Sequence, residues 1–480
     1  MEIKMGDGGF RQQNLKTEQG KCRRLCGKRA AFLNLGCKVN AYETQAMKEC
    51  FLQAGAQIVE FEDWADIYVV NTCTVTNIAD RKSRQMLHRA KKKNPDGIVV
   101  AVGCYVQAAE QELQNDLSAD ILVGNNKKSE IADLVAQYIE ENKGEEQKSL
   151  VVRIASEKNY EEMEITTAEN TRAYLKVQDG CNQFCTYCII PYARGRIRSR
   201  NIEAVEAEVR RLAAAGYQEI VLTGIHLSSY GMEDYSEKER FALRPANGDV
   251  PLVNLIRCID RVPGIERIRL GSLEPRIVTE PFAEAIAKTK ICPHFHLSLQ
   301  SGCNETLERM NRRYCTEEYL ESCKILRRFY DRPAITTDVI VGFPGESEEE
   351  FEKTMQFVEK VQFAQMHIFK YSRRRGTKAA DMPGQVSEQV KAARSEALFA
   401  LEEKMRRAYE QSFFKEETTV LFEESVQLEG KSFMIGHNER YIKFAMQTEQ
   451  DLSNLFVKGQ IKGDYAGEIL LFERKQSKED

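Results

Sequence analysis

Apolar and polar residues alternate along the first third of the chain in blocks that suit strands and helices in turn. Each apolar run of strand length is followed by residues with helical spacing. Such alternation predicts a parallel sheet with crossover helices. We therefore expect an N-terminal α/β domain over 29–142, preceded by a flexible polar extension over 1–28. The expected strands of this domain lie at 30–36, 65–73, 97–104 and 121–124.

A second alternating array follows a polar, acidic segment. This segment, 143–172, predicts a linker with at most a short strand at 150–155. Six strand-and-helix units come next and predict an α/β barrel, partial or complete, over 173–383. The expected strands of the barrel lie at 174–180, 219–225, 265–272, 295–299, 334–342 and 365–372.

The pattern changes again toward the C-terminal end of the chain. A long amphipathic stretch predicts a helical connector over 384–414. From Thr418 onward only short strand patterns occur, which suits a small all-β barrel over 415–476. The predicted fold class is therefore α/β, with an all-β module at the C-terminal end.

Composition narrows the functional classes. The 480 residues are 42% hydrophobic and 30% charged with a formal charge of −4, ordinary values that exclude collagenous, mucin-like and wholly disordered chains. No apolar run approaches the roughly 18 residues that span a bilayer. Residues 1–28 also lack the apolar core of a secretory signal. We expect a cytoplasmic protein without a membrane partner.

The 14 cysteines need an explanation, because disulfides do not persist in a reducing cytosol. Cys181, Cys185 and Cys188 form C-x3-C-x2-C directly after the first strand of the second array. Zinc ribbons usually supply four ligands. Three thiolates can instead hold three irons of a 4Fe–4S cluster and leave the fourth iron open to a substrate. The alternative interpretation is three thiols grouped by chance.

A second set of cysteines is dispersed in the sequence but shares one position in the predicted sheet. Cys37, Cys73 and Cys104 each follow a predicted strand. The carboxyl ends of parallel strands meet at one edge, where open α/β folds bind their ligands. We expect a second three-thiolate site there, the alternative being buried packing cysteines. Cys22 and Cys26 are interpreted as exposed thiols, and the remaining cysteines as packing or incidental.

With the C-x3-C-x2-C motif the chain resembles the radical S-adenosylmethionine superfamily. Further features of that superfamily fall at predicted strand ends, within 222–231, 298–302 and 342–345. The resemblance implies a 4Fe–4S cluster that cleaves S-adenosylmethionine. It also implies that Tyr187, Gly224 and Gln300 contact this cofactor.

The order of the three units, from about Arg29 to Phe472, is similar to that of the methylthiotransferases. That family implies two 4Fe–4S clusters, the second held by Cys37, Cys73 and Cys104 and involved in sulfur transfer. It also implies a C-terminal TRAM domain that binds RNA, and an electron donor such as flavodoxin or ferredoxin. S-adenosylmethionine would serve as both methyl donor and radical source.

Shorter strings distinguish the branches of that family. The segments 71–85, 180–195, 222–231 and 296–314 are most similar to the MtaB-type branch. Its substrate is tRNA carrying N6-threonylcarbamoyladenosine at position 37, which is methylthiolated at C2. The alternatives are the isopentenyladenosine branch and the branch that modifies an aspartyl residue of a ribosomal protein. A zinc-containing RNA-binding protein is the non-enzymatic alternative.

Basic residues near the predicted barrel mouth are candidates for RNA contact, because arginine and lysine position phosphates. A solvated charged face is the alternative interpretation. In the C-terminal module, Tyr441 and Phe444 are candidates for base stacking or for core packing. His226 and His367 end predicted strands and either approach the substrate or are structural. The basic candidates are Arg194, Arg196, Arg198, Arg200, Arg440 and Lys443.

Overall fold

The computed structural model describes residues 24–474 apart from 117, 142–146, 169–170, 244, 246–247 and 466–468. Most of the predicted extension, including Cys22, lies outside the described residues. The prediction of a flexible extension does not hold for residues 24–28. Leu25 is fully buried there, and its N–H donates to the carbonyl of Ala54 at 2.9 Å. Among the described residues, no helix is long and apolar enough to cross a membrane.

The N-terminal unit is a six-stranded parallel sheet in the order β2-β1-β3-β4-β5-β6, as its alternating pattern predicts. The two central strands, β3 and β4, are buried along their whole length, which is why they form continuous apolar runs. The strands are β1 (Arg29–Asn34), β2 (Gln57–Val59), β3 (Ile67–Thr72), β4 (Ile98–Gly103), β5 (Ile121–Val123) and β6 (Lys148–Leu150). The helices are α1 (Lys38–Gln53), α2 (Asn77–Lys93), α3 (Cys104–Ala108), α4 (Glu110–Gln114) and α5 (Ile131–Glu140).

The acidic segment 143–172 is more than a linker. Its strand lies at 148–150 rather than 150–155 and adds the edge strand β6 to the N-terminal sheet. Beyond it, Ile165 is buried, and the N–H of Thr166 donates to the Glu49 carboxylate on α1 at 2.8 Å. Isolated apolar residues separated by acidic residues anchor this segment to the rest of the protein. Because they are not regularly spaced, the sequence pattern did not predict the contact.

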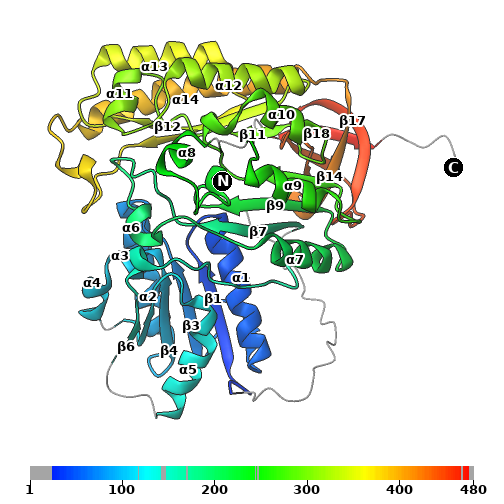
Figure 1. The fold of residues 1–480 in the computed structure, drawn as a ribbon. Coiled ribbons are helices and arrows are strands. Elements are labelled where there is room, and N and C mark those ends of the chain that lie inside the picture. Colours follow the sequence, from blue (N-terminus) through cyan, green and yellow to red (C-terminus); the bar gives the residue numbers. More distant parts are fainter. Residues whose placement is uncertain are drawn as a thin grey trace.

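The central unit is a half-barrel of six parallel strands (Figure 1). Isolated bridges at Ile268–Ile291 and Leu273–Leu297 join its two sheets, and no pairing between β7 and β13 closes it in the described part of the chain. Of the two predicted possibilities, the partial barrel is therefore confirmed. The strands are β7 (Arg172–Asp179), β9 (Glu219–Gly224), β10 (Arg267–Leu270), β11 (His294–His296), β12 (Ala334–Val341) and β13 (Gln365–Lys370), with β8 (Arg198–Ser199) antiparallel on β7.

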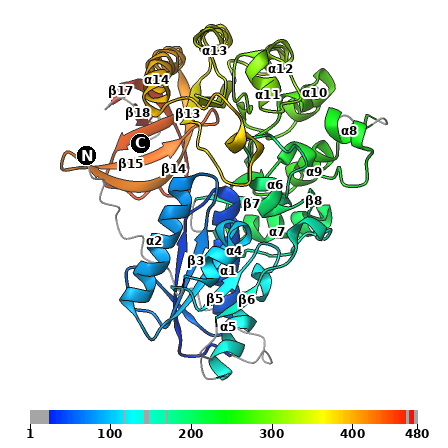
Figure 2. The same ribbon diagram turned by 90° about the vertical axis from the view of Figure 1, so that its left-hand side faces the viewer.

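Helices cover the outside of the half-barrel and both of its open edges. The helix α1 of the N-terminal unit packs against β7, and α14 (Glu388–Gln411) packs against β13. The N-terminal unit thus lies directly against the half-barrel, with α1 at the contact (Figures 1 and 2). The other helices are α6 (Ile190–Arg194), α7 (Ile202–Ala214), α8 (Glu237–Ala242), α9 (Pro251–Asp260), α10 (Glu280–Ala287), α11 (Asn304–Arg309), α12 (Thr316–Phe329) and α13 (Glu348–Val361).

The C-terminal unit is a closed five-stranded barrel in the order β14-β15-β16-β18-β17, which confirms the predicted all-β module. It lies beside the half-barrel (Figure 2). Arg267 and Arg269 of β10 join the two units by donating to the carbonyls of Thr419 and Asn438 at 2.7 and 2.6 Å. The strands are β14 (Glu417–Leu428), β15 (Lys431–His437), β16 (Lys443–Gln447), β17 (Phe456–Tyr465) and β18 (Ile469–Arg474).

Tyr441 is the centre of this contact. Its ring stacks on His294 and on His437, with centroid distances of 5.1 and 4.5 Å. The guanidinium groups of Arg172 and Arg269 lie 4.7 and 5.0 Å from its centroid. The ring is therefore occupied by protein partners, and base stacking, one of the two predicted roles of Tyr441, is wrong. Burial, together with the charge of Arg269, holds the pKa of His294 well below its ordinary value, and burial also lowers the pKa of His437.

Acidification is expected to weaken this contact. As the pH falls below about 6.5, His294 and His437 become protonated in the unfolded chain but stay neutral in the folded protein. The free energy of unfolding therefore falls and should be lower at pH 5.5 than at pH 7.5. Thermal unfolding at the two pH values checks this. A His294→Gln variant should lose the part of the pH dependence that is due to His294, and an unchanged dependence in that variant contradicts the assignment.

Candidate active site at the carboxyl ends of the parallel strands

The loop between β7 and α6 holds Cys181, Cys185 and Cys188. The start of the loop is tied to the end of α6, because the N–H of Cys181 donates to the carbonyl of Gly195 at 3.0 Å, and within the loop the N–H of Cys188 donates to the carbonyl of Cys185 at 2.9 Å. Burial raises the pKa of Cys188 to about 12, and the neighbouring Cys185 thiolate raises it as well. Burial and Cys185 likewise raise the pKa of Cys181. The structure thus brings the three predicted thiols together.

A guanidinium group lies beside this set. Arg312 donates from Nη1 to the sulfur of Cys185 at 3.2 Å. Its positive charge lowers the pKa values of Cys181 and Cys188, against the effect of burial. A cation in hydrogen-bond contact favours the thiolate, the form that binds metal. No sequence pattern indicated that Arg312 would lie beside the thiols.

Gly180 fixes the entry into the cysteine loop. Its φ is +72°, and a Cβ at this position would lie 1.8 Å from the carbonyl oxygen of Arg196. A Gly180→Ala variant is expected to lose ~2 kcal/mol or more of stability, since both strain and a backbone clash oppose it. The thermal midpoint and the bound iron of the purified variant measure the effect.

Gly216 offers the matched control for this substitution. Its φ is +94°, but nothing lies within 4 Å of an added Cβ. Gly216→Ala should therefore cost only about 1 kcal/mol, from backbone strain alone. Equal losses in the two variants would show that the clash at Gly180 does not matter.

The second predicted set also converges. Cys37, Cys73 and Cys104 follow β1, β3 and β4, at the carboxyl edge of the N-terminal sheet. Burial raises the pKa of Cys73 to about 11, with further increases from Cys104 and Cys37 and a decrease from Arg194. The three thiols therefore sense one another electrostatically, as the parallel topology predicts.

The spacing of the thiols discriminates between kinds of metal site. A tetrahedral zinc ion with Zn–S bonds of about 2.3 Å places its sulfur ligands roughly 3.8 Å apart. Among the described residues, neither cysteine set has three sulfur atoms within 4.8 Å of one another. Single-ion zinc sites thus fit both sets poorly, whereas a larger polynuclear group can span such separations.

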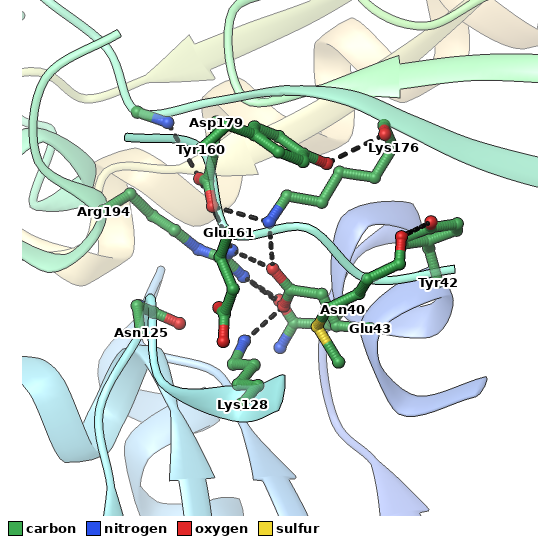
Figure 3. A network of polar contacts seen from close by, with 12 residues as sticks. Asn40, Tyr42, Glu43, Asn125, Lys128, Tyr160, Glu161, Lys176, Asp179 and Arg194 are labelled. Atoms are coloured by element: carbon green, nitrogen blue, oxygen red, sulfur yellow. Dashed lines mark hydrogen bonds and ion pairs between the residues drawn. The ribbon is translucent and has the colours of Figure 1, made fainter. Parts of the chain in front are cut away.

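Three of the predicted RNA-contact arginines are buried, so this assignment is corrected. Arg194, Arg198 and Arg200 are each at most 1% exposed, because they form ion pairs inside the protein. Their partners include Asp179 (Figure 3) and Glu43, which lies 151 positions from Arg194 in the sequence. A local pattern of arginines carries no information on such partners.

The other basic candidates lie nearer the surface. Arg196 is exposed, with its guanidinium 4.5 Å from the ring centroid of Phe184. Arg440 is less available than predicted, since its side chain is 15% exposed and lies over Phe413. Lys443 is half-buried and lines, with Arg440, a cavity of about 860 Å³ between the half-barrel, α14 and the C-terminal barrel.

The three predicted cofactor contacts lie at strand ends of the half-barrel or in the cysteine loop. The ring of Tyr187 packs edge-on against Phe343, with centroids 6.4 Å apart. Gly224 ends β9. Gln300 adopts a φ of +74° and donates its N–H to the carbonyl of Asp338 at 2.8 Å. Their contact with S-adenosylmethionine stays a prediction.

His226 has a partner that sequence analysis missed. Its Nε2 lies 3.1 Å from the carboxylate of Glu274, which Arg276 also contacts. Burial opposes the charge of Glu274, but hydrogen bonds from His226 and Arg276 prevail and lower its pKa to about 2. Glu274 lies in the segment 271–275 that follows β10, where its position after a strand was the available signal.

Three polar side chains of neighbouring strands form a further group. Ligand atoms of His296, Asp338 and His367 all lie within 4.8 Å of one another. Nε2 of His296 is 3.2 Å from the Asp338 carboxylate, and the other ring nitrogen is 3.1 Å from the hydroxyl of Thr336. Burial lowers the pKa of His367, and the nearby charge of Lys38 adds a smaller lowering effect.

Comparison with known proteins decides the family. Residues 175–358 match the radical SAM superfamily, and residues 29–124 match the uncharacterized protein family UPF0004. Threonylcarbamoyladenosine tRNA methylthiotransferase MtaB of Bacillus subtilis is 40% identical, covering 90% of this chain and 93% of that protein. The chain belongs to the radical S-adenosylmethionine methylthiotransferase family. It is therefore an enzyme, and the alternative of a non-enzymatic zinc protein is wrong.

Other family members place this methylthiotransferase among its relatives. MtaB of Aquifex aeolicus is 42% identical over 83% of this chain and 93% of its own length. A tRNA-2-methylthio-N(6)-dimethylallyladenosine synthase of Pelotomaculum thermopropionicum is 34% identical over 86% and 90%. The radical S-adenosylmethionine methyltransferase TsrM of Kitasatospora setae shares the fold, with a TM-score of 0.54 over 74% of this chain and 77% of TsrM at 15% identity. Membership implies use of S-adenosylmethionine and a 4Fe–4S cluster.

Proposed function

We propose that this enzyme transfers a methylthio group to C2 of N6-threonylcarbamoyladenosine at position 37 of tRNA. S-adenosylmethionine serves as methyl donor and as radical source. The observation that carries the proposal is the pair of three-cysteine sets at the carboxyl ends of two parallel sheets, within a chain 40% identical to an MtaB protein. The 34% identity to a dimethylallyladenosine synthase makes that branch the main alternative.

Cys181, Cys185 and Cys188 are the proposed ligands of the cluster that cleaves S-adenosylmethionine. Three thiols enclosed in one loop, with Arg312 donating to Cys185, fit a group that needs three thiolates and one open iron. When bound, this cluster supplies the electron that breaks a C–S bond of S-adenosylmethionine. Tyr187, Gly224 and Gln300 are proposed to position that molecule, and a flavodoxin or ferredoxin to provide the electron.

Cys37, Cys73 and Cys104 are the proposed ligands of a second 4Fe–4S cluster, which takes part in sulfur transfer. Their sulfur atoms do not all lie within 4.8 Å of one another, and this spacing and the parallel-sheet edge suit this group. Anaerobically reconstituted protein should hold about eight irons per chain. Four irons and no second cluster would contradict this part of the proposal.

We also propose that the C-terminal barrel is a TRAM domain over 415–476 that binds the tRNA. Exposed Arg196 and half-buried Lys443 are the basic residues that remain available for phosphate from the predicted set. The domains at 29–142 and 173–383 would then provide the two clusters. Because the chain carries a net charge of −4, attraction to RNA depends on such local groups.

Nucleoside mass spectrometry of tRNA tests the substrate. Deletion of the gene should remove the methylthio group from threonylcarbamoyladenosine and leave methylthiolated isopentenyladenosine unchanged. Loss from isopentenyladenosine, or from a ribosomal protein aspartyl residue, would move the enzyme to a sister branch. Restoration by the intact gene, but not by a Cys185→Ala copy, ties the loss to this active site.

A further inference from the structure

A buried ionic network joins the N-terminal unit to the half-barrel (Figure 3). At its centre the carboxylate of Glu43, on α1, is 1% exposed. Arg194 and Lys176 reach it at 2.5 and 2.7 Å, and Lys128 contacts it as well. The network therefore connects α1 of the N-terminal unit with β7 and α6 of the half-barrel.

A second carboxylate extends the network. Asp179, at the end of β7 and two residues before Cys181, lies 2.7 Å from Lys176 and 3.2 Å from Arg194. Arg198 approaches it at 3.7 Å. Four cations thus share two carboxylates in the described part of the chain, which leaves a surplus of two positive charges. Every side chain involved is at most 4% exposed.

A buried surplus of this kind is unfavourable unless a further anion balances it, since an uncompensated buried charge costs several kcal/mol. The geometry indicates where that anion belongs. Arg194 donates from Nε to the sulfur of Cys104 at 3.1 Å and from Nη2 to Asn40 at 2.6 Å. Asn40 in turn accepts from the thiol of Cys37 at 3.8 Å. The surplus therefore faces the cysteine set of the N-terminal sheet.

We propose that this surplus of positive charge balances the negative charge of the second 4Fe–4S cluster, the auxiliary cluster. Arg194 is the positioning residue that places this charge beside the cluster. The inference rests on the proposed function, because it takes Cys37, Cys73 and Cys104 as cluster ligands. Thiolates on an iron–sulfur core make a net anionic group, and hydrogen bonds to its sulfurs raise its reduction potential. Arg194 therefore makes the auxiliary cluster easier to reduce.

Arg194 also gives the two sites a physical connection. It ends α6, the helix that follows the Cys181–Cys188 loop, yet its guanidinium contacts a cysteine of the other sheet. Arg312 plays the equivalent part at Cys185. Each cysteine set thus has one arginine that donates to one of its sulfurs, and these two arginines can be exchanged for neutral residues independently.

Redox titration followed by electron paramagnetic resonance tests the proposal on the full-length, anaerobically reconstituted enzyme. Comparison with a Cys73→Ala variant identifies which signal belongs to the auxiliary cluster. In Arg194→Gln we expect at least a tenfold lower ratio of reduced to oxidised auxiliary cluster at a fixed potential, a shift of 59 mV for one electron. Arg194→Lys should recover most of the shift, because it keeps the charge. Arg312→Gln should move the other cluster alone.

Two further variants keep the test independent of folding. Lys128→Gln removes one cation without touching a cysteine, so it should shift the auxiliary potential in the same direction by a smaller amount. Glu43→Gln removes an anion and should shift it in the opposite direction. Opposite signs cannot arise from general loosening of the site. If Arg194→Gln fails to retain the auxiliary cluster, the shifts in Lys128→Gln and Glu43→Gln decide whether the surplus charge sets its potential.

The outcomes separate the inference from the function on which it depends. Wild-type enzyme with four irons and one signal would contradict the auxiliary cluster itself. If the enzyme holds two clusters and neither potential changes in Arg194→Gln, the proposed role of the surplus charge is wrong. It is also wrong if Lys128→Gln and Glu43→Gln shift the auxiliary potential in the same direction. Either result leaves the assignment of the cluster ligands intact.

Discussion

A Cys185→Ala variant is expected to cleave no detectable S-adenosylmethionine. Cys185 is the sulfur that Arg312 contacts, and its charge acts on both Cys181 and Cys188. Its removal leaves two thiolates, too few to hold three irons of a cluster with one open corner. Production of 5′-deoxyadenosine in the presence of a strong reductant, measured by chromatography, should fall to background.

The control for this variant is Cys258→Ala. Cys258 lies on α9 of the same half-barrel, and its thiol donates to Glu206 rather than to any cysteine. This variant should cleave S-adenosylmethionine at a rate within about twofold of the wild type, since surface changes away from a site alter stability by only ~0.5 kcal/mol. Substantial 5′-deoxyadenosine from Cys185→Ala would remove the C-x3-C-x2-C loop as the cleavage site.

A Cys73→Ala variant is expected to separate the two halves of the reaction. Cys73 follows β3 of the N-terminal sheet and has no contact with the Cys181–Cys188 loop among the hydrogen bonds of the described residues. Cleavage of S-adenosylmethionine should therefore continue, while transfer of the methylthio group to tRNA stops. Both products can be measured in one assay, 5′-deoxyadenosine by chromatography and the modified nucleoside by mass spectrometry.

Cys50→Ala provides the comparison within the same unit. Cys50 is half-buried on α1 but lies more than three helical turns from Cys37 along that helix. It should retain both cleavage and transfer. Full transfer by Cys73→Ala would exclude the N-terminal cysteine set from the chemistry, whatever the iron content of the variant.

The parallel sheet and the meeting of the cysteines could be foreseen from the sequence for the same reason. Parallel strands place their carboxyl ends on one edge, so Cys37, Cys73 and Cys104 had to converge once the alternating pattern was recognised. The strand β2 was missed because three residues, Gln57–Val59, carry too little pattern. Leu25 and Ile165 were missed because each is a single apolar anchor in a polar segment.

The charged groups could not be placed in advance. Arg194 and Glu43 are separated by 151 positions, and only the packing of α1 on β7 brings them together. The series Arg194, Arg198 and Arg200 therefore suggested a basic surface, although burial and ion pairs make it part of the interior. The partners of charged side chains depend on tertiary structure, whereas strands and cysteine motifs can be recognised from the local sequence.

The packing of α1 has a consequence for how the protein folds. One continuous apolar core contains Tyr42 and Phe51 of α1 together with Val177 of β7 and Val205 of α7, while the C-terminal barrel has a core of its own. The N-terminal sheet and the half-barrel therefore form a single cooperative unit, although two separate family models describe them. Either unit expressed alone would expose part of a shared interior, and the distance between the two cysteine sets is fixed by that interior rather than by a hinge.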